Sequence, residues 1–140
     1  MIIDKLMIIK WEIQREGGRQ MSYDVTLVEP VSKSTVRLPN NHLMTGGTYC
    51  IGGTNEAWLN ITSNYAELYV KAFGNPEGIK CLIGMQAVDS ISLLESAIGN
   101  LGDETDDDYW TATEGNAKKP LYSLLAMAKL RPDAIWEIDY

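Results

Sequence analysis

The spacing of apolar residues changes partway along the chain, and this change limits the fold more than any other feature. Between residues 22 and 62, in stretches such as "SYDVTLVEP", apolar and polar positions alternate as in half-buried strands. After residue 63 apolar positions recur every three to four residues, which predicts helices at 64–73, 87–101 and 116–130. Strands and helices do not alternate regularly, which argues against a doubly wound sheet. We therefore predict an α+β fold with an N-terminal antiparallel sheet of three or four strands packed against about three helices.

Short segments rich in β-branched and aromatic residues are the expected strands of this sheet. The stretches "SYDVTLVEP" (22–30), which Pro30 closes, and "STVRLP" (34–39) are expected to form a hairpin, and residues 46–53 and 56–62 two further strands. The C-terminal "AIWEI" also alternates, which predicts an edge strand. We expect Pro120 in the first turn of the third helix, where its missing N–H costs little. The shared core is expected to contain Trp58, Leu94, Ile98, Leu124 and Leu125.

Length and composition indicate one domain. A chain of 140 residues with 45% hydrophobic content is large enough to bury a single core without disulfides or metals. The segment "REGGRQ" directly precedes Met21, and Glu-Gly-Gly codons can spell the ribosome-binding sequence that precedes a bacterial start codon. We expect Met21 to be the natural start, residues 1–20 to be a translated leader or N-terminal extension, and residues 21–140 to be a single α+β domain.

The cysteines and apolar runs indicate the compartment. Two cysteines, Cys50 and Cys81, are too few for a disulfide framework, and no Cys/His cluster is typical of zinc. No apolar run approaches the roughly 20 residues needed to cross a bilayer. Charges interrupt the apolar N-terminal segment, unlike in a signal peptide. We expect a cytoplasmic protein without membrane contact.

The stretch "GGTYCIGGT", residues 46–54, has the glycine spacing of a phosphate-binding loop. Such a loop needs a lysine for the phosphates and a helix that begins directly after it. Gly53 stands where that lysine belongs, and the following "NEAWLNIT" has the pattern of a strand. We therefore interpret the glycines as turns or bulges beside a short strand, and expect no nucleotide cofactor.

Catalytic patterns are weak elsewhere. His42 is the single histidine, in "LPNNHLM", and we expect it in a surface loop rather than as a catalytic base. Cys50 and Cys81 have apolar neighbours, which favours packing over reactivity. We expect no enzyme activity, no catalytic residue, no metal and no cofactor.

The stretch "GDETDDDYW" is the most unusual in the chain. It places five carboxylates within residues 103–108 and two aromatic residues directly after them. A calcium site is one reading, but the spacing lacks the EF-hand pattern. A solvated loop with inward aromatics is the second. The third is a partner-binding surface in which carboxylates imitate a nucleic-acid backbone and aromatics anchor the contact. Its residues are Asp103, Glu104, Asp106, Asp107, Asp108, Tyr109 and Trp110.

The charge balance favours a basic partner. Removing the four Lys/Arg and three Asp/Glu of residues 1–20 from the totals of 12 and 19 leaves 8 basic and 16 acidic residues, a net charge of −8. Direct binding to nucleic acid needs clustered Lys/Arg, so we expect none. A basic protein is the partner that fits.

Several short segments carry a family resemblance over most of residues 21–140. They are the "MSYDVTL" start, Asn60-Ile61-Thr62, Asp108-Tyr109-Trp110, Gly115-Asn116-Ala117 and "RPDAIW" at 131–136. With them the chain resembles a group of small proteins of phages, prophages and other mobile elements of bacteria. The resemblance implies no catalytic residue. It implies a setting, because small acidic phage proteins often block host defence machinery by occupying a basic nucleic-acid channel.

Two functions are therefore expected from different classes. The first is a non-enzymatic inhibitor of a host defence system in the bacterial cytoplasm, for example of a CRISPR nuclease, which acts by protein–protein binding. The alternative is a protein that sequesters a small molecule or signalling nucleotide between sheet and helices. An acidic body disfavours an anionic ligand unless Lys118 and Lys119, near a helix N-terminus, compensate.

Overall fold

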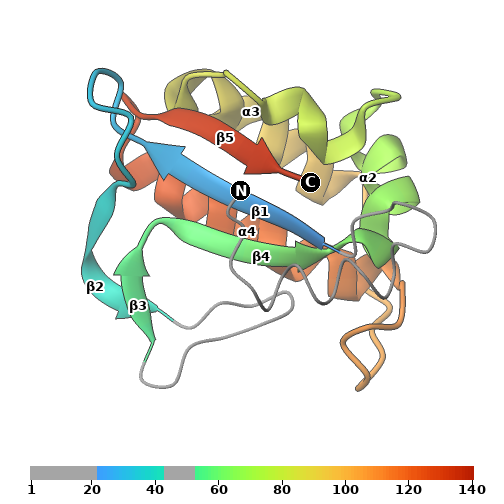
Figure 1. Cartoon of the computed structure of the whole chain (residues 1–140). Coiled ribbons are helices and arrows are strands. Elements are labelled where there is room, and N and C mark those ends of the chain that lie inside the picture. The colour runs from blue at the N-terminus through green and yellow to red at the C-terminus, as the bar shows by residue number, and fades with distance from the viewer. Residues whose placement is uncertain (1–21, 43–52) are drawn as a thin grey trace.

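The structure is a computed structural model that describes residues 22–42 and 53–140, and it confirms the α+β fold (Figure 1). Three strands form an antiparallel sheet, two further strands pair separately, and three helices follow the fourth strand. The strands are β1 (Ser22–Val28), β2 (Arg37–His42), β3 (Thr54–Glu56), β4 (Trp58–Thr62) and β5 (Ile135–Asp139). The helices are α2 (Ala66–Phe73), α3 (Ala87–Gly99) and α4 (Glu114–Leu130), with 3₁₀ turns η2 (Ser63–Tyr65) and η3 (Gly78–Leu82).

Strand β1 lies in the centre of the main sheet, in the order β4-β1-β5. Val25 faces Leu59 of β4 on one side and Ile138 of β5 on the other. Because side chains alternate along a strand, residues that lie opposite each other share a face. The inward face is therefore apolar across all three strands. "AIWEI" forms the expected edge strand, and it pairs with the first strand of the chain.

The expected hairpin of residues 22–30 and 34–39 is wrong beyond its turn. The two segments meet only near the turn, where Val28 bridges Thr35 and the Val36 amide donates to the Leu27 carbonyl (2.9 Å). The chain then leaves the main sheet, and β2 pairs with β3. Pro39 in β2 has no N–H to donate, so this segment cannot serve as an interior strand.

The three helices lie close to their expected positions, each within about three residues of the predicted bounds. Figure 1 shows α3 and α4 behind the sheet and α2 at one end of it. Of the expected core residues, Leu94, Ile98 and Leu124 are buried. Trp58 and Leu125 are only partly buried. Trp58 lies opposite Thr26, on the outer face of the sheet, and the fully buried tryptophan is Trp136.

The expected position of Pro120 is also wrong, because α4 begins two residues earlier than predicted. Thr113 caps the helix by accepting from the Asn116 amide (3.2 Å), which places Pro120 in the second turn. A proline there removes one hydrogen bond of the helix. In the same turn, the buried Tyr69 hydroxyl donates to the Ala117 carbonyl (2.7 Å) and ties α4 to α2.

Some expectations lie outside the described residues. They are the leader at 1–20 and all of the strand expected at 46–53 except Gly53. Within residues 22–42 and 53–140, no helix is both long and apolar enough to cross a membrane.

Candidate functional site

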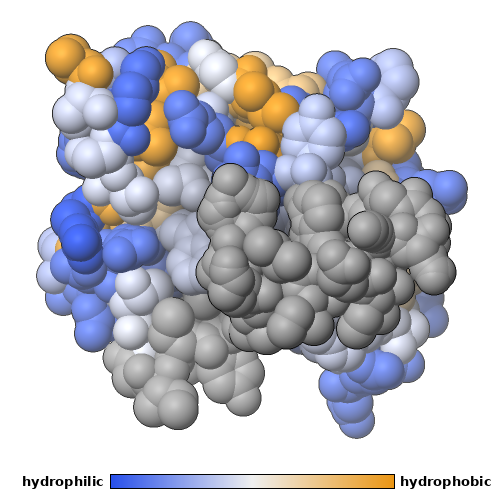
Figure 2. Space-filling view, viewed as in Figure 1, coloured by the Kyte–Doolittle hydropathy of each residue, from blue (hydrophilic) through white to orange (hydrophobic). Residues whose placement is uncertain are grey.

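The segment from Asp103 to Trp110, here called the acidic segment, joins α3 to α4. It projects from one corner of the molecule, as the orange loop of Figure 1 and a hydrophilic protrusion in Figure 2. Every residue from Asp103 to Asp108 is exposed. The segment contains no helix or strand, so hydrogen bonds to its neighbours must determine its shape.

Asn116, in the first turn of α4, holds the acidic segment. Its side chain is 1% exposed, and Nδ2 lies 3.1 to 3.2 Å from the carbonyl oxygens of Asp106, Asp108 and Thr111. Its Oδ1 accepts from the Asp106 amide (3.3 Å). One buried amide therefore binds both donors and acceptors of the segment backbone. The carbonyls turn inward toward Asn116, which leaves the carboxylates outside.

Gly115 makes this close approach possible. A Cβ at this position would lie 2.6 Å from the Asp103 carbonyl oxygen and 2.5 Å from that of Glu104. The Gly115 amide donates to the same Glu104 oxygen (2.8 Å). Any larger residue would push the segment away from the helix. Gly115 and Asn116 together therefore hold the acidic segment against the start of α4.

The carboxylates have different roles. Asp106 and Asp108 each accept a hydrogen bond from an amide two residues later, at 2.8 and 3.0 Å, and so tighten the loop. Asp103 pairs with Lys118 of α4 at 2.6 Å. The side-chain carboxylates of Glu104 and Asp107 make no hydrogen bond or ion pair with any described residue. The segment thus presents a fixed negative surface with two side chains open to a partner.

The two aromatic residues of the segment point in different directions, Tyr109 toward the core and Trp110 toward solvent. The Tyr109 ring packs edge-on against Tyr65, with centroids 5.5 Å apart, and Tyr65 Oη donates to the Tyr109 carbonyl. The Tyr109 hydroxyl is buried without a hydrogen-bond partner among the described residues. Burial raises the pKa of this hydroxyl. Trp110 is 50% exposed. Of the pair, Tyr109 belongs to the fold and Trp110 is open to contact.

Glu114 anchors the other end of the segment. Its carboxylate accepts from Lys71 of α2 (2.6 Å) and from the Gly102 amide (2.7 Å). The Lys71 ammonium is the main cause that lowers the pKa of this carboxyl group. Glu114 therefore stays ionised, and it joins α2, the start of the acidic segment and α4.

The remaining sequence candidates lie elsewhere. Thr54, directly after the glycines, begins strand β3, so the helix that a phosphate-binding loop requires is absent there. His42 is not in a loop: it ends β2, and its Nε2 lies 2.8 Å from the Glu56 carbonyl oxygen, to which it donates. Cys81 is half-buried against the core, and burial raises the pKa of its thiol.

No family model, curated protein or solved structure matches the chain. In the part of the chain that the structure describes, no three His, Cys, Asp or Glu side chains are grouped to hold a metal ion. The role of Asn116 was missed by the sequence reasoning. The available signal was its position three residues after Thr113, at a helix start that follows a loop.

Proposed function

We propose that the protein is a non-enzymatic inhibitor that binds a basic partner protein through the acidic segment. The observation that supports this most is the preformed shape of the segment, whose backbone is bound by the buried Asn116 amide. A loop that is already ordered loses little conformational entropy on binding. Its carboxylates can therefore attract a basic partner while the loop loses little conformational entropy.

The partner is best described by its complementary surface. The carboxylates of Glu104 and Asp107 face solvent, and the half-exposed Trp110 offers an aromatic anchor beside them. Such a surface fits a Lys/Arg-lined groove that normally binds a nucleic-acid backbone. With the resemblance to phage and prophage proteins, this favours a bacterial defence nuclease, for example a CRISPR nuclease, as the target in the host cytoplasm.

The alternative, sequestration of a signalling nucleotide, has less support. Lys118, expected to help hold an anionic ligand, is in an ion pair with Asp103 and its side chain is 14% exposed. Two experiments compare the functions. A rise in melting temperature with an added nucleotide favours sequestration. Capture of a basic protein in a pull-down from the host favours inhibition.

The deciding experiment changes Asp106, Asp107 and Asp108 together to Asn. Asn retains Oδ1, so the hydrogen bonds to the amides of Asp108 and Trp110 can persist. Affinity for purified CRISPR nucleases, or for a basic protein captured from the host, should fall at least tenfold, while the melting temperature stays nearly unchanged. Association should also slow with rising salt, because exposed charges are screened beyond about 10 Å near 0.1 M.

The matched control carries the same change in charge elsewhere. Glu67, Glu137 and Asp139 are exposed, so the triple variant Glu67→Gln, Glu137→Gln, Asp139→Asn alters net charge equally. It should retain most of the affinity. Equal losses in both variants would mean that only the overall charge matters, and unchanged affinity of the Asp106–Asp108 variant at low salt would remove the acidic segment from the contact.

A further inference from the structure

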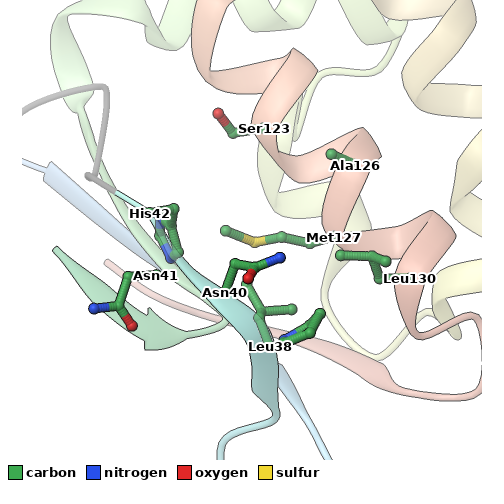
Figure 3. A pocket seen from close by; sticks show the side chains of 9 residues that line it. Leu38, Asn40, Asn41, His42, Ser123, Ala126, Met127 and Leu130 are labelled. Atoms are coloured by element: carbon green, nitrogen blue, oxygen red, sulfur yellow. The ribbon is translucent and has the colours of Figure 1, made fainter.

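A cavity of about 230 Å³ lies between strand β2 and helix α4 (Figure 3). Residues from the two elements form its opposite walls: Leu38 to His42 from the strand, and Ser123, Ala126, Met127 and Leu130 from the helix. Its distance from the acidic segment follows from the helix, because Met127 is twelve residues after Gly115 and the helix rises about 1.5 Å per residue. The cavity therefore lies roughly 18 Å along α4 from the proposed partner surface.

The walls of the cavity have an apolar and a polar part. Figure 3 shows Met127 extending from α4 toward strand β2, and Met127, Leu130 and Leu38 are the largest apolar side chains of the lining. The polar part is the Asn40 side-chain amide, the Ser123 hydroxyl and the His42 ring. The hydrogen bond from His42 Nε2 to the Glu56 carbonyl (2.8 Å) orients that ring at one end of the cavity.

The size of the cavity limits its ligand. An apolar cavity of about 150 Å³ holds one benzene molecule, so one of about 230 Å³ has room for a two-ring molecule. A methionine sulfur and an aliphatic wall are favourable neighbours for an aromatic ring. A flat, fused ring system therefore matches both the volume and the apolar wall.

The charges around the cavity limit its ligand further. Among the residues that the structure describes, none that lines the cavity is Lys, Arg, Asp or Glu. If a phosphate or carboxylate group moved from water into this cavity, no described cation would contact it, and the loss of hydration would cost free energy. An amide and a hydroxyl, in contrast, provide both hydrogen-bond donors and acceptors for ring nitrogens or carbonyls.

We propose that this cavity is a binding site for a small, uncharged heteroaromatic molecule of about two rings, such as a purine base. The ring lies between Met127, Leu130 and Leu38, and its heteroatoms face Asn40 and Ser123. The site uses no residue of the acidic segment. It is therefore independent of the proposed inhibitory function, and either can fail without the other.

Adenine is the probe, and the Met127 methyl group is the reporter. In protein labelled at methionine methyls, Met127→Leu identifies the signal. Adenine should shift it with a Kd of about 1 mM, since small ligands gain a limited affinity per atom. No shift up to about 5 mM adenine would overturn the proposal.

Variants test whether the shift comes from the cavity. Ala126 lines it from an exposed position on α4, so Ala126→Phe should fill it and weaken adenine binding at least tenfold. Lys129→Phe places the same side chain on the exposed helix outside the cavity and should change the Kd less than twofold. If Ala126→Phe unfolds the protein, Ser123→Phe replaces it. Binding that survives filling of the cavity would contradict the site.

Ligand analogues test the chemical class. Indole has the same ring size but few heteroatoms, and it should bind about fivefold more weakly than adenine; Asn40→Leu should cost adenine a similar factor. Equal binding of indole would overturn recognition by the polar wall. Adenosine and its 5′-monophosphate should bind within threefold of each other, because no Lys or Arg is among the described residues of the lining. A tenfold gain from the phosphate would overturn the uncharged class.

Discussion

At the scale of single residues, the acidic segment depends on Gly115 and Asn116 more than on its own side chains. Asn116 binds three carbonyl oxygens and one amide of the loop from a buried position. A buried amide that satisfies several backbone groups is costly to replace, because each group that loses its partner must be desolvated without compensation. The negative surface is thus built by neutral residues on the following helix.

Gly115→Ala tests this dependence directly. The added methyl group would meet the Asp103 and Glu104 carbonyl oxygens at 2.6 and 2.5 Å, so the segment must move. We expect a loss of about 2–3 kcal/mol in the free energy of unfolding, measured by urea denaturation. Gly99→Ala in α3 is the control: its Cβ would meet nothing within 4 Å, and alanine favours helices, so stability should stay equal or rise by up to about 1 kcal/mol. Equal effects of the two changes would contradict the steric argument.

At the scale of elements, Arg131 fastens the end of α4 to the sheet. Its guanidinium donates to both Glu29 oxygens, at 3.1 and 2.6 Å, and to both Asp133 oxygens, at 3.0 and 2.9 Å. Glu29 directly follows β1, and Asp133 precedes β5. One side chain therefore joins a helix end to segments beside two strands that are more than 100 residues apart in the chain.

The stability that Arg131 provides should depend on pH. Arg131 is the main cause that lowers the pKa of both Glu29 and Asp133 below their ordinary values of 4.5 and 3.8. A carboxyl group whose pKa is lower in the folded state stabilises the fold above the unfolded-state pKa, and this contribution is lost as pH falls through the folded-state pKa. The native protein should therefore lose stability below about pH 4.5.

Arg131→Met should be less stable at pH 7 and should lose stability less steeply between pH 5 and about pH 3. Melting temperatures across this range provide the measurement. Arg37→Met is the control, because Arg37 is exposed and lies 3.7 Å from its carboxylate partner Glu56. Parallel pH profiles of Arg131→Met and the native protein would show that Arg131 does not set the acid sensitivity.

At the scale of the whole molecule, the fold is closed by its last strand. β5 pairs with β1, and its Trp136 is fully buried, with Nε1 donating to Ser90 Oγ of α3 (2.8 Å). The Trp136 amide also donates to the Met85 carbonyl (3.0 Å), before α3. The beginning, middle and end of the described chain therefore meet at one strand.

Deletion of residues 135–140 should abolish cooperative unfolding. The deletion leaves the central strand β1 without its partner β5. It also removes Trp136, and truncation of that side chain alone is expected to lower the free energy of unfolding by about 3–5 kcal/mol. Near-UV circular dichroism and thermal melts measure the result. Deletion of Tyr140 alone is the control: this residue is 54% exposed, and its cation–π contact with Lys80, 4.4 Å from the ring, contributes little. A shortened chain that still melts cooperatively would contradict the role of β5.

The sequence by itself determined the class of fold and the position of each helix. Alternation in residues 22–28 and helical spacing after residue 63 arise from local geometry, and a local pattern is visible in one segment alone. The sequence also marked the acidic segment, because a run of five carboxylates is a matter of composition. The exposure of Asp103 to Asp108 follows the same logic, since ionised carboxylates almost always stay in contact with water.

The tertiary structure alone decided which segments meet. No local signal shows that β1 pairs with β4 and β5 instead of β2, because strand pairing depends on how whole faces pack. The same holds for Trp58, which satisfied the pattern but lies on the outer face, and for Tyr109, which turns inward while Trp110 stays exposed. Asn116 and the cavity between β2 and α4 required the third dimension as well. The cavity is built from two segments that are far apart in the chain, and only packing brings them together. The partners of Asn116 lie five to ten residues before it, but no sequence pattern shows how the loop turns back to meet its amide.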